Sequence, residues 1–86
     1  MQLTFYPLFL SIIVVILAAM ERINRIKEVL VATDKSQKWL AKELNKSTTA
    51  VTAFCNNKSQ PHLKDLKRIA EILDVDIRDL LVPTKT

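Results

Sequence analysis

The absence of glycine is the feature that most limits how this 86-residue chain can fold. Glycine ordinarily supplies the positive φ angles of tight turns, so every left-handed turn here must use another residue, most cheaply asparagine or aspartate. Phosphate-binding loops of nucleotide-binding proteins also need glycine where the backbone approaches the phosphate. The chain therefore contains neither a P-loop nor a dinucleotide-binding turn.

Residues that form disulfides or bind metals are scarce. Cys55 is the only cysteine and His62 the only histidine, which excludes an internal disulfide and a multi-cysteine zinc site. We therefore expect no metal, no cofactor and no enzymatic activity. Cys55 is expected to be a small, partly buried apolar residue, and His62 to begin a helix at the surface.

Positive charge is concentrated in the middle third of the chain. The formal net charge is +4, but residues 35–68 alone hold eight basic and two acidic side chains. Residues 69–86 hold two basic and four acidic side chains. This asymmetry points to an anionic partner, with nucleic acid as the first candidate, and a solvated basic face is the alternative interpretation.

The composition changes abruptly near Met20. Residues 1–19 contain fifteen apolar residues and no charged side chain. They are interpreted as a membrane anchor over residues 3–20, as a secretory signal, or as an apolar leader added by a start codon upstream of a natural start at Met20. A secretory signal needs a basic segment before the apolar run and small residues at its cleavage site, and neither is present here. An anchor would press the next helix against the bilayer, because no linker follows.

Residues 20–82 are interpreted as one helical domain, followed by a tail at residues 83–86. Apolar residues recur at helical spacing, and Ser36 and Ser47 are placed to cap two of the segments. Short connections between the segments predict a compact all-α, five-helix bundle. The predicted helices are residues 21–33, 37–44, 48–56, 62–73 and 77–81. The predicted inward residues are Ile23, Ile26, Val29, Leu30, Leu40, Ala41, Leu44, Val51, Phe54, Leu63, Leu66, Ile69, Ala70 and Leu73.

The short connection at Asn45 has the spacing of a helix-turn-helix unit. Such a unit needs a small residue where its two helices cross and, four positions later, a residue that tolerates a left-handed backbone. Six positions after that it needs a β-branched residue that enters the core. Ala41, Asn45 and Val51 occupy these three places, within the most basic part of the chain.

Longer motifs surround this turn. Residues 36–41, Ser-Gln-Lys-Trp-Leu-Ala, follow the pattern S-Q-x-x-L-A, and residues 47–52, Ser-Thr-Thr-Ala-Val-Thr, follow the pattern of a recognition segment. Residues 54–58 are similar to W-x-N-G-K/R, and residues 69–75 to L-A-x-x-L-x-V. Over residues 22–82 the sequence resembles the Cro/C1-type (XRE) helix-turn-helix family, which has the lambda-repressor-like fold. The apolar N-terminal segment has no counterpart in that family.

Two departures from the family pattern affect what the resemblance implies. The family usually has glycine where Asn45 and Asn57 stand, and asparagine is the next cheapest residue in that conformation. We expect a positive φ angle at both positions, and we expect glycine to be tolerated at both. The family often has an arginine near Thr48 and Ala53, and its absence here leaves hydroxyl, amide and methyl groups to read bases.

The resemblance implies that the helix from Thr48 lies in the major groove of double-stranded DNA. Ser47 is expected to cap this helix, Trp39 to pack against a neighbouring helix, and Lys42 to be solvated. The expected base contacts are Gln37, Thr48, Thr49 and Thr52. The expected phosphate contacts are Lys38, Lys46, Asn56 and Lys58.

Helix-turn-helix proteins usually bind DNA as dimers on two half-sites. Ile77, Leu81 and Val82 are the candidate two-fold contact, unless they only close the core. We expect a homodimeric, sequence-specific transcription regulator of the small repressor or restriction-modification controller type, of prokaryotic or phage origin, cytoplasmic and nucleoid-associated. The alternatives are an antitoxin-type helix-turn-helix protein and a membrane-anchored helical interaction module at the cytoplasmic face of the membrane.

Overall fold

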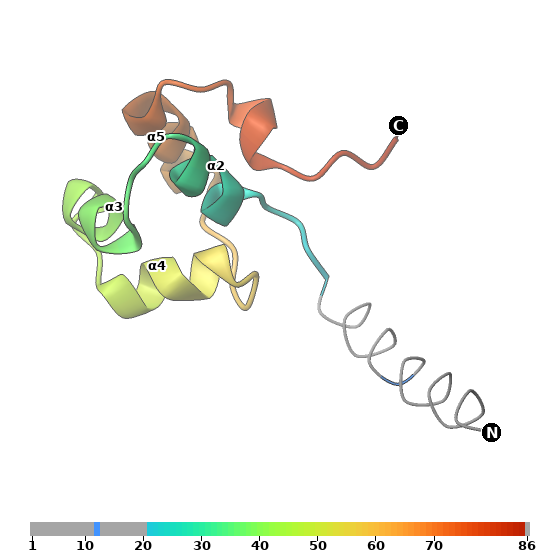
Figure 1. Cartoon of the computed structure of the whole chain (residues 1–86), viewed down its shortest axis with the longest axis horizontal. Helices are drawn as coiled ribbons and strands as arrows, with labels where there is room; N and C mark the ends of the chain where they lie inside the picture. Colours follow the sequence, from blue (N-terminus) through green and yellow to red (C-terminus); the bar gives the residue numbers. More distant parts are fainter. Residues whose placement is uncertain (1–11, 13–20, 86) are drawn as a thin grey trace.

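The computed structural model describes residue 12 and residues 21–85. Residues 21–85 contain four α-helices and one 3₁₀ helix (Figure 1). In Figure 1, α4 runs along the lower edge of the bundle and a short turn joins it to α3, with α2 and α5 above it. The predicted all-α fold is confirmed. The elements are α2 (Ile26–Ala32), α3 (Gln37–Leu44), α4 (Thr48–Cys55), α5 (Leu63–Leu73) and the 3₁₀ helix η1 (Ile77–Leu80).

The interpretations of the apolar N-terminal segment concern residues 1–20, which, apart from the exposed Ile12, lie outside the described residues. Within the described part of the chain, no helix combines the length and the apolar character that a membrane crossing requires.

The hydrophobic core forms where the apolar stripes of the helices face one another. Burying a leucine, isoleucine, valine or phenylalanine side chain contributes about 1.5–3 kcal/mol relative to leaving it in water. All five elements contribute to the core, which explains why such short helices are stable together. The buried apolar residues are Ile26, Leu30, Leu40, Ala41, Leu44, Val51, Phe54, Cys55, Leu66, Ile69, Ala70, Leu73 and Leu80.

The first predicted helix begins later than expected. Helix α2 starts at Ile26 rather than near Glu21, and Ile23 is 47% exposed rather than inward. The Asn24 side chain accepts the backbone N–H of Ile26 at 3.1 Å, a local bond that competes with helix formation. Asn24 also pairs with Leu81 in an isolated antiparallel bridge. The residues before α2 are therefore held by the C-terminal segment and not by a helix.

The last two predicted helices also need correction. Helix α5 begins at Leu63, with His62 exposed before it, and Leu63 is 78% exposed although its spacing predicts an inward position. Helical spacing predicts which side of a helix faces the core. It does not predict over which turns of the helix another element covers that side. The last helix is a 3₁₀ helix ending at Leu80. The third predicted helix, which is α4, also differs slightly, because it ends at Cys55 rather than Asn56.

The 3₁₀ helix η1 begins with a side-chain cap. The Asp76 carboxylate accepts the backbone N–H of Arg78 at 2.8 Å and lies 3.2 Å from its guanidinium. Hydrogen bonds from the Arg78 side chain and backbone lower the pKa of Asp76. The cap satisfies a backbone donor that so short a helix leaves open.

Left-handed residues end the helices in place of glycine. Asn45 has a φ angle of 56° and Asn57 one of 58°, which confirms both predictions. Asp34 and Asp74 have φ angles of 58° and 56°. One such residue thus follows each of the helices α2 to α5, because asparagine and aspartate adopt this conformation at the lowest cost after glycine.

Candidate nucleic-acid interface

The turn between α3 and α4 is built as its spacing predicts. Ala41 is 3% exposed and Val51 is fully buried, so the two helices pack closely where they cross. After the left-handed Asn45, the backbone N–H of Lys46 donates to Ala41 O at 2.9 Å and closes the end of α3. Ser47 Oγ then accepts a backbone N–H of the first turn of α4 at 3.1 Å. These contacts set the position of α4 relative to α3.

Helix α4 presents a polar face. Thr48 and Thr49 are exposed at its N-terminal end, and Thr52 is half-buried one turn further on. A groove of about 300 Å³ follows this face. Most of the predicted base and phosphate contacts therefore lie side by side. The groove is lined by Thr48, Thr49, Thr52, Ala53, Asn56 and Lys58.

Gln37 connects α3 to this face. Its Oε1 atom accepts a hydrogen bond from the hydroxyl of Thr52 at 2.9 Å. Both residues are half-buried. Two of the predicted base contacts are thus bonded to each other, and the bond joins the start of α3 to the middle of α4.

The predicted phosphate contacts differ in how accessible their charge is. Lys38 and Lys58 are exposed, and Lys38 lines, together with Thr48, a second groove of about 440 Å³ at the start of α4. Lys46 Nζ lies 3.3 Å from Asp65 Oδ2 of α5. A phosphate would have to compete with this carboxylate for Lys46.

Trp39 has the packing role expected of it. It is half-buried and packs against the hydrophobic core from α3. Lys35 Nζ lies 4.9 Å from the centroid of its ring, within the range of a cation–π interaction. Lys42 is exposed on the same helix, as expected.

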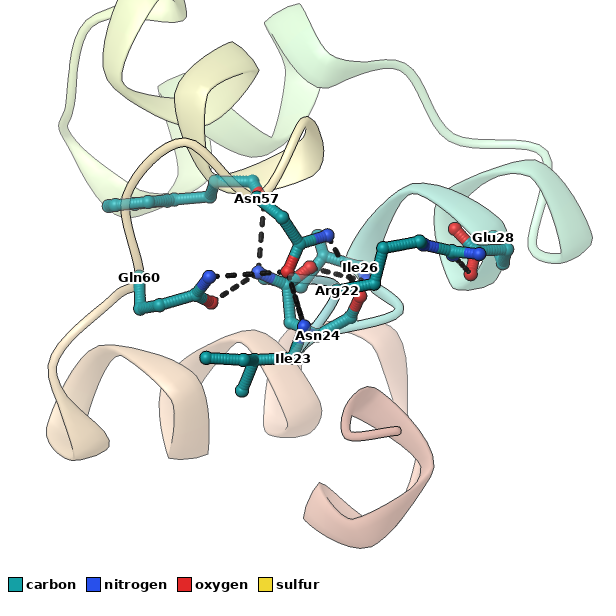
Figure 2. A network of polar contacts seen from close by, with 8 residues as sticks. Arg22, Ile23, Asn24, Ile26, Glu28, Asn57 and Gln60 are labelled. Atoms are coloured by element: carbon teal, nitrogen blue, oxygen red, sulfur yellow. Dashed lines mark hydrogen bonds and ion pairs between the residues drawn. The ribbon is translucent and has the colours of Figure 1, made fainter. Parts of the chain in front are cut away.

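A polar network joins the segment before α2 to the end of α4 (Figure 2). Asn24 is the one buried polar residue among those described, at 1% exposure. Its Nδ2 atom donates to Phe54 O at 2.9 Å and to Gln60 Oε1 at 2.6 Å. Asn24 and Gln60 were not predicted from the sequence, because an isolated asparagine or glutamine carries no periodic signal.

Asn57 forms the other half of this network. Its Oδ1 atom accepts the backbone N–H groups of Ile23 and Asn24 at 2.8 and 2.9 Å and the Gln60 side-chain amide at 3.2 Å. Its Nδ2 atom donates to Asn24 O at 3.1 Å. Glycine could adopt the same φ angle but could form none of these bonds. We therefore revise the expectation that glycine is tolerated at this position.

The candidate two-fold residues already have contacts within the chain. Ile77 and Leu81 pack against the core. Val82 donates its backbone N–H to Ile23 O at 2.8 Å. All three are half-buried. A second copy of the chain could therefore cover only the portion of these side chains that is still exposed to solvent.

Cys55 lies on the inner side of α4, at the wall of a groove of about 780 Å³. It is 4% exposed, and burial raises the pKa of its thiol from 9.0 to about 11. The thiolate is the reactive form of cysteine. Cys55 is therefore a buried core residue with low reactivity at neutral pH.

We expect the Cys55 thiol to react slowly with a disulfide reagent in the folded chain, with a rate that rises toward pH 11. The urea-unfolded chain, as the control, should titrate near pH 9.0. Because the unfolded chain ionises this thiol first, the free energy of unfolding should fall between these two pH values. Stopped-flow labelling and urea titrations measure both effects, with Cys55→Ala as the reference. Equal rates in the folded and unfolded chain would contradict the prediction.

Comparisons with known proteins agree with this geometry. A family model described as helix-turn-helix matches residues 26–80. A crystal structure of a "putative DNA-binding protein" from Bacteroides fragilis is 44% identical, covers 69% of this chain and 95% of its own, and has a TM-score of 0.68. The comparison with curated proteins found no match. This chain belongs to the helix-turn-helix family of the Cro/C1 (XRE) type.

Proposed function

We propose that this chain is a transcription regulator that binds double-stranded DNA in a sequence-specific manner. The observation that carries the proposal is the exposed N-terminal face of α4, where Thr48 and Thr49 project from a helix anchored by the buried Val51. A recognition helix points its N-terminal residues at base edges in the major groove. The family and the similarity to the Bacteroides fragilis structure support a DNA-binding regulator.

Thr48 and Thr49 read bases in this proposal. A threonine hydroxyl can donate or accept a hydrogen bond, and its methyl group can contact thymine. Gln37 adds a carboxamide from α3. Lys46 reaches DNA only if a phosphate replaces Asp65 as its partner. The proposed phosphate contacts are Lys38, Lys46, Asn56 and Lys58.

The charge distribution supports the same surface. Residues 35–68, which hold the excess of basic side chains, form the helix-turn-helix unit and the first half of α5. Positive charge on one part of a domain attracts the phosphate backbone of DNA, and this attraction supplies most of the non-specific affinity of the domain for DNA. The C-terminal part, residues 69–86, carries more acidic than basic side chains.

The finer form of the proposal is a homodimer that binds two half-sites, as a small repressor or restriction-modification controller does. Ile77, Leu81 and Val82 are the proposed two-fold contact, because they form a half-buried apolar group at the end of the domain. Such a regulator works in the cytoplasm, on the nucleoid.

We expect the full chain to bind a random-sequence duplex with a Kd tighter than about 10⁻⁴ M near physiological salt, because non-specific binders reach that affinity through phosphate contacts. The logarithm of the affinity should fall with the logarithm of salt concentration by about 0.9 per phosphate contact. Fluorescence anisotropy at several salt concentrations measures both quantities. Weaker binding at every salt concentration would contradict the proposal.

Two variants then separate base contacts from phosphate contacts. Lys58→Ala should weaken binding to all duplexes alike and reduce the salt slope by about 1, whereas Lys85→Ala in the tail is the matched control. Thr48→Ala combined with Thr49→Ala should reduce discrimination between preferred and random duplexes by roughly tenfold or more. If the double variant loses the same affinity for every sequence, these threonines do not read bases.

A further inference from the structure

Thr52 and Gln37 form a contact that orients the Gln37 carboxamide. The Thr52 hydroxyl donates its hydrogen to Gln37 Oε1 at 2.9 Å. Thr52 also lines the groove along α4, so the contact lies at the edge of the proposed DNA-facing surface. The backbone beneath Gln37 is fixed in turn, because Ser36 Oγ caps α3 by accepting the backbone N–H of Trp39 at 3.0 Å.

The three threonines of α4 are not equivalent. Thr48 and Thr49 are exposed, whereas Thr52 is half-buried and turned toward α3. A hydroxyl has one hydrogen to donate, and in Thr52 this hydrogen is already used by Gln37. Thr52 therefore lacks the free donor that Thr48 and Thr49 can offer to a base.

The orientation of the Gln37 carboxamide has a chemical consequence. A glutamine that recognises adenine uses both ends of its carboxamide, with the oxygen accepting from N6 and the nitrogen donating to N7. The Thr52 hydroxyl holds the Gln37 oxygen toward α4. With Oε1 held by Thr52, the N–H groups of Nε2 remain to donate to an acceptor on DNA, while Oε1 keeps one further lone pair.

We propose that Thr52 is a positioning residue for Gln37, and that Gln37 Nε2 donates to an acceptor on the DNA, either a phosphate oxygen or the N7 atom of a purine. This inference rests on the proposed DNA-binding function and deepens it. It replaces the expected base contact of Thr52 with an indirect role.

The first test is a double-variant cycle on the full chain, with the duplex that the wild-type chain enriches most from a random library. Valine keeps the shape of threonine and removes its hydroxyl. Thr52→Val and Gln37→Ala should each lower affinity about five- to tenfold, the effect of one hydrogen bond. The double variant should bind no more weakly than Gln37→Ala alone.

Thr52→Ser is the conservative control, because serine keeps the donor and should restore wild-type affinity. Thermal melting of each variant confirms that the fold is retained. If Thr52→Val lowers affinity by the same factor with and without Gln37, Thr52 acts independently of Gln37, and the positioning role is overturned. Failure of Thr52→Ser to restore binding would overturn it as well.

The second test locates the acceptor by changing single atoms of the enriched duplex. A methylphosphonate at one phosphate, or a 7-deazapurine at one base, should weaken binding of the wild-type chain by a larger factor than binding of Gln37→Ala. The first pattern identifies a phosphate and the second a purine N7 atom. If no such change affects the wild-type chain more than Gln37→Ala, the assignment alone is overturned. If the wild-type chain enriches no duplex, the proposed function itself fails and this assignment fails with it.

Discussion

Replacing Asn57 with glycine is expected to lower the free energy of unfolding by about 2–4 kcal/mol, although glycine adopts a left-handed backbone more easily than asparagine does. The Asn57 side chain pairs with the backbone N–H and C=O groups of Asn24. Asn24 is 1% exposed, which limits how far water can replace these bonds. Each buried polar group left without a partner costs about 1–3 kcal/mol.

Asn45 offers the matched control for this substitution. It has nearly the same φ angle as Asn57, but it is exposed, and no side-chain hydrogen bond of Asn45 is found within the described part of the chain. Asn45→Gly should change the free energy of unfolding by less than about 0.5 kcal/mol. Urea titrations followed by circular dichroism measure both variants. Equal losses at the two positions would show that the Asn57 side chain adds nothing beyond its backbone conformation.

Replacing Asn24 with alanine is expected to have an effect of similar size, about 2–4 kcal/mol. The variant loses the side-chain acceptor for the Ile26 backbone N–H at the start of α2 and the donors to Phe54 O and Gln60 Oε1. All these groups lie at the junction between the segment before α2 and the end of α4. For a domain of this size the melting temperature should fall by roughly 10 °C or more.

The double variant of Asn24→Ala and Asn57→Gly tests whether the two residues act as one network. Residues in one hydrogen-bond network show coupling of about 0.5–3 kcal/mol, so the combined loss should be clearly smaller than the sum of the single losses. Asn56→Ala is the control, because Asn56 is exposed at the same end of α4. Additive losses for Asn24 and Asn57 would contradict a shared network.

The same network bears on the proposed interface. Phe54 O and Asn57 lie at the C-terminal end of α4, next to Asn56 and Lys58, which are proposed to contact phosphates. The N-terminal end of α4 is held separately, by the turn at Asn45. The helix proposed to enter the major groove is thus fixed at both ends by asparagines that stand where the family usually has glycine.

Local rules predicted the helix-turn-helix unit well. Ser36 and Ser47 cap their helices, and Asn45 has the left-handed conformation, as the sequence predicts. Ala41 and Val51 are buried at the crossing of α3 and α4. Each of these features depends on a residue and on neighbours within a few positions, so it can be predicted without knowledge of the fold.

The same rules failed where the environment comes from a distant segment. Ile23 and Leu63 have the spacing of inward residues, but both are exposed. Ile23 precedes α2 because its neighbour Asn24 pairs with Leu81 at the other end of the chain. Leu63 is the first residue of α5, and periodicity does not tell which turns of a helix another element covers.

The helix-turn-helix unit, most of the core and the glycine-free turns follow from local sequence, because caps, periodicity and backbone preferences act over a few residues. Which polar side chains meet depends on the packing of the helices. It paired Asn57 with Asn24, Thr52 with Gln37, and Lys46 with Asp65. A hydrogen bond or ion pair between separate segments forms only when the packing of the helices brings both partners within reach, and no local pattern specifies that distance.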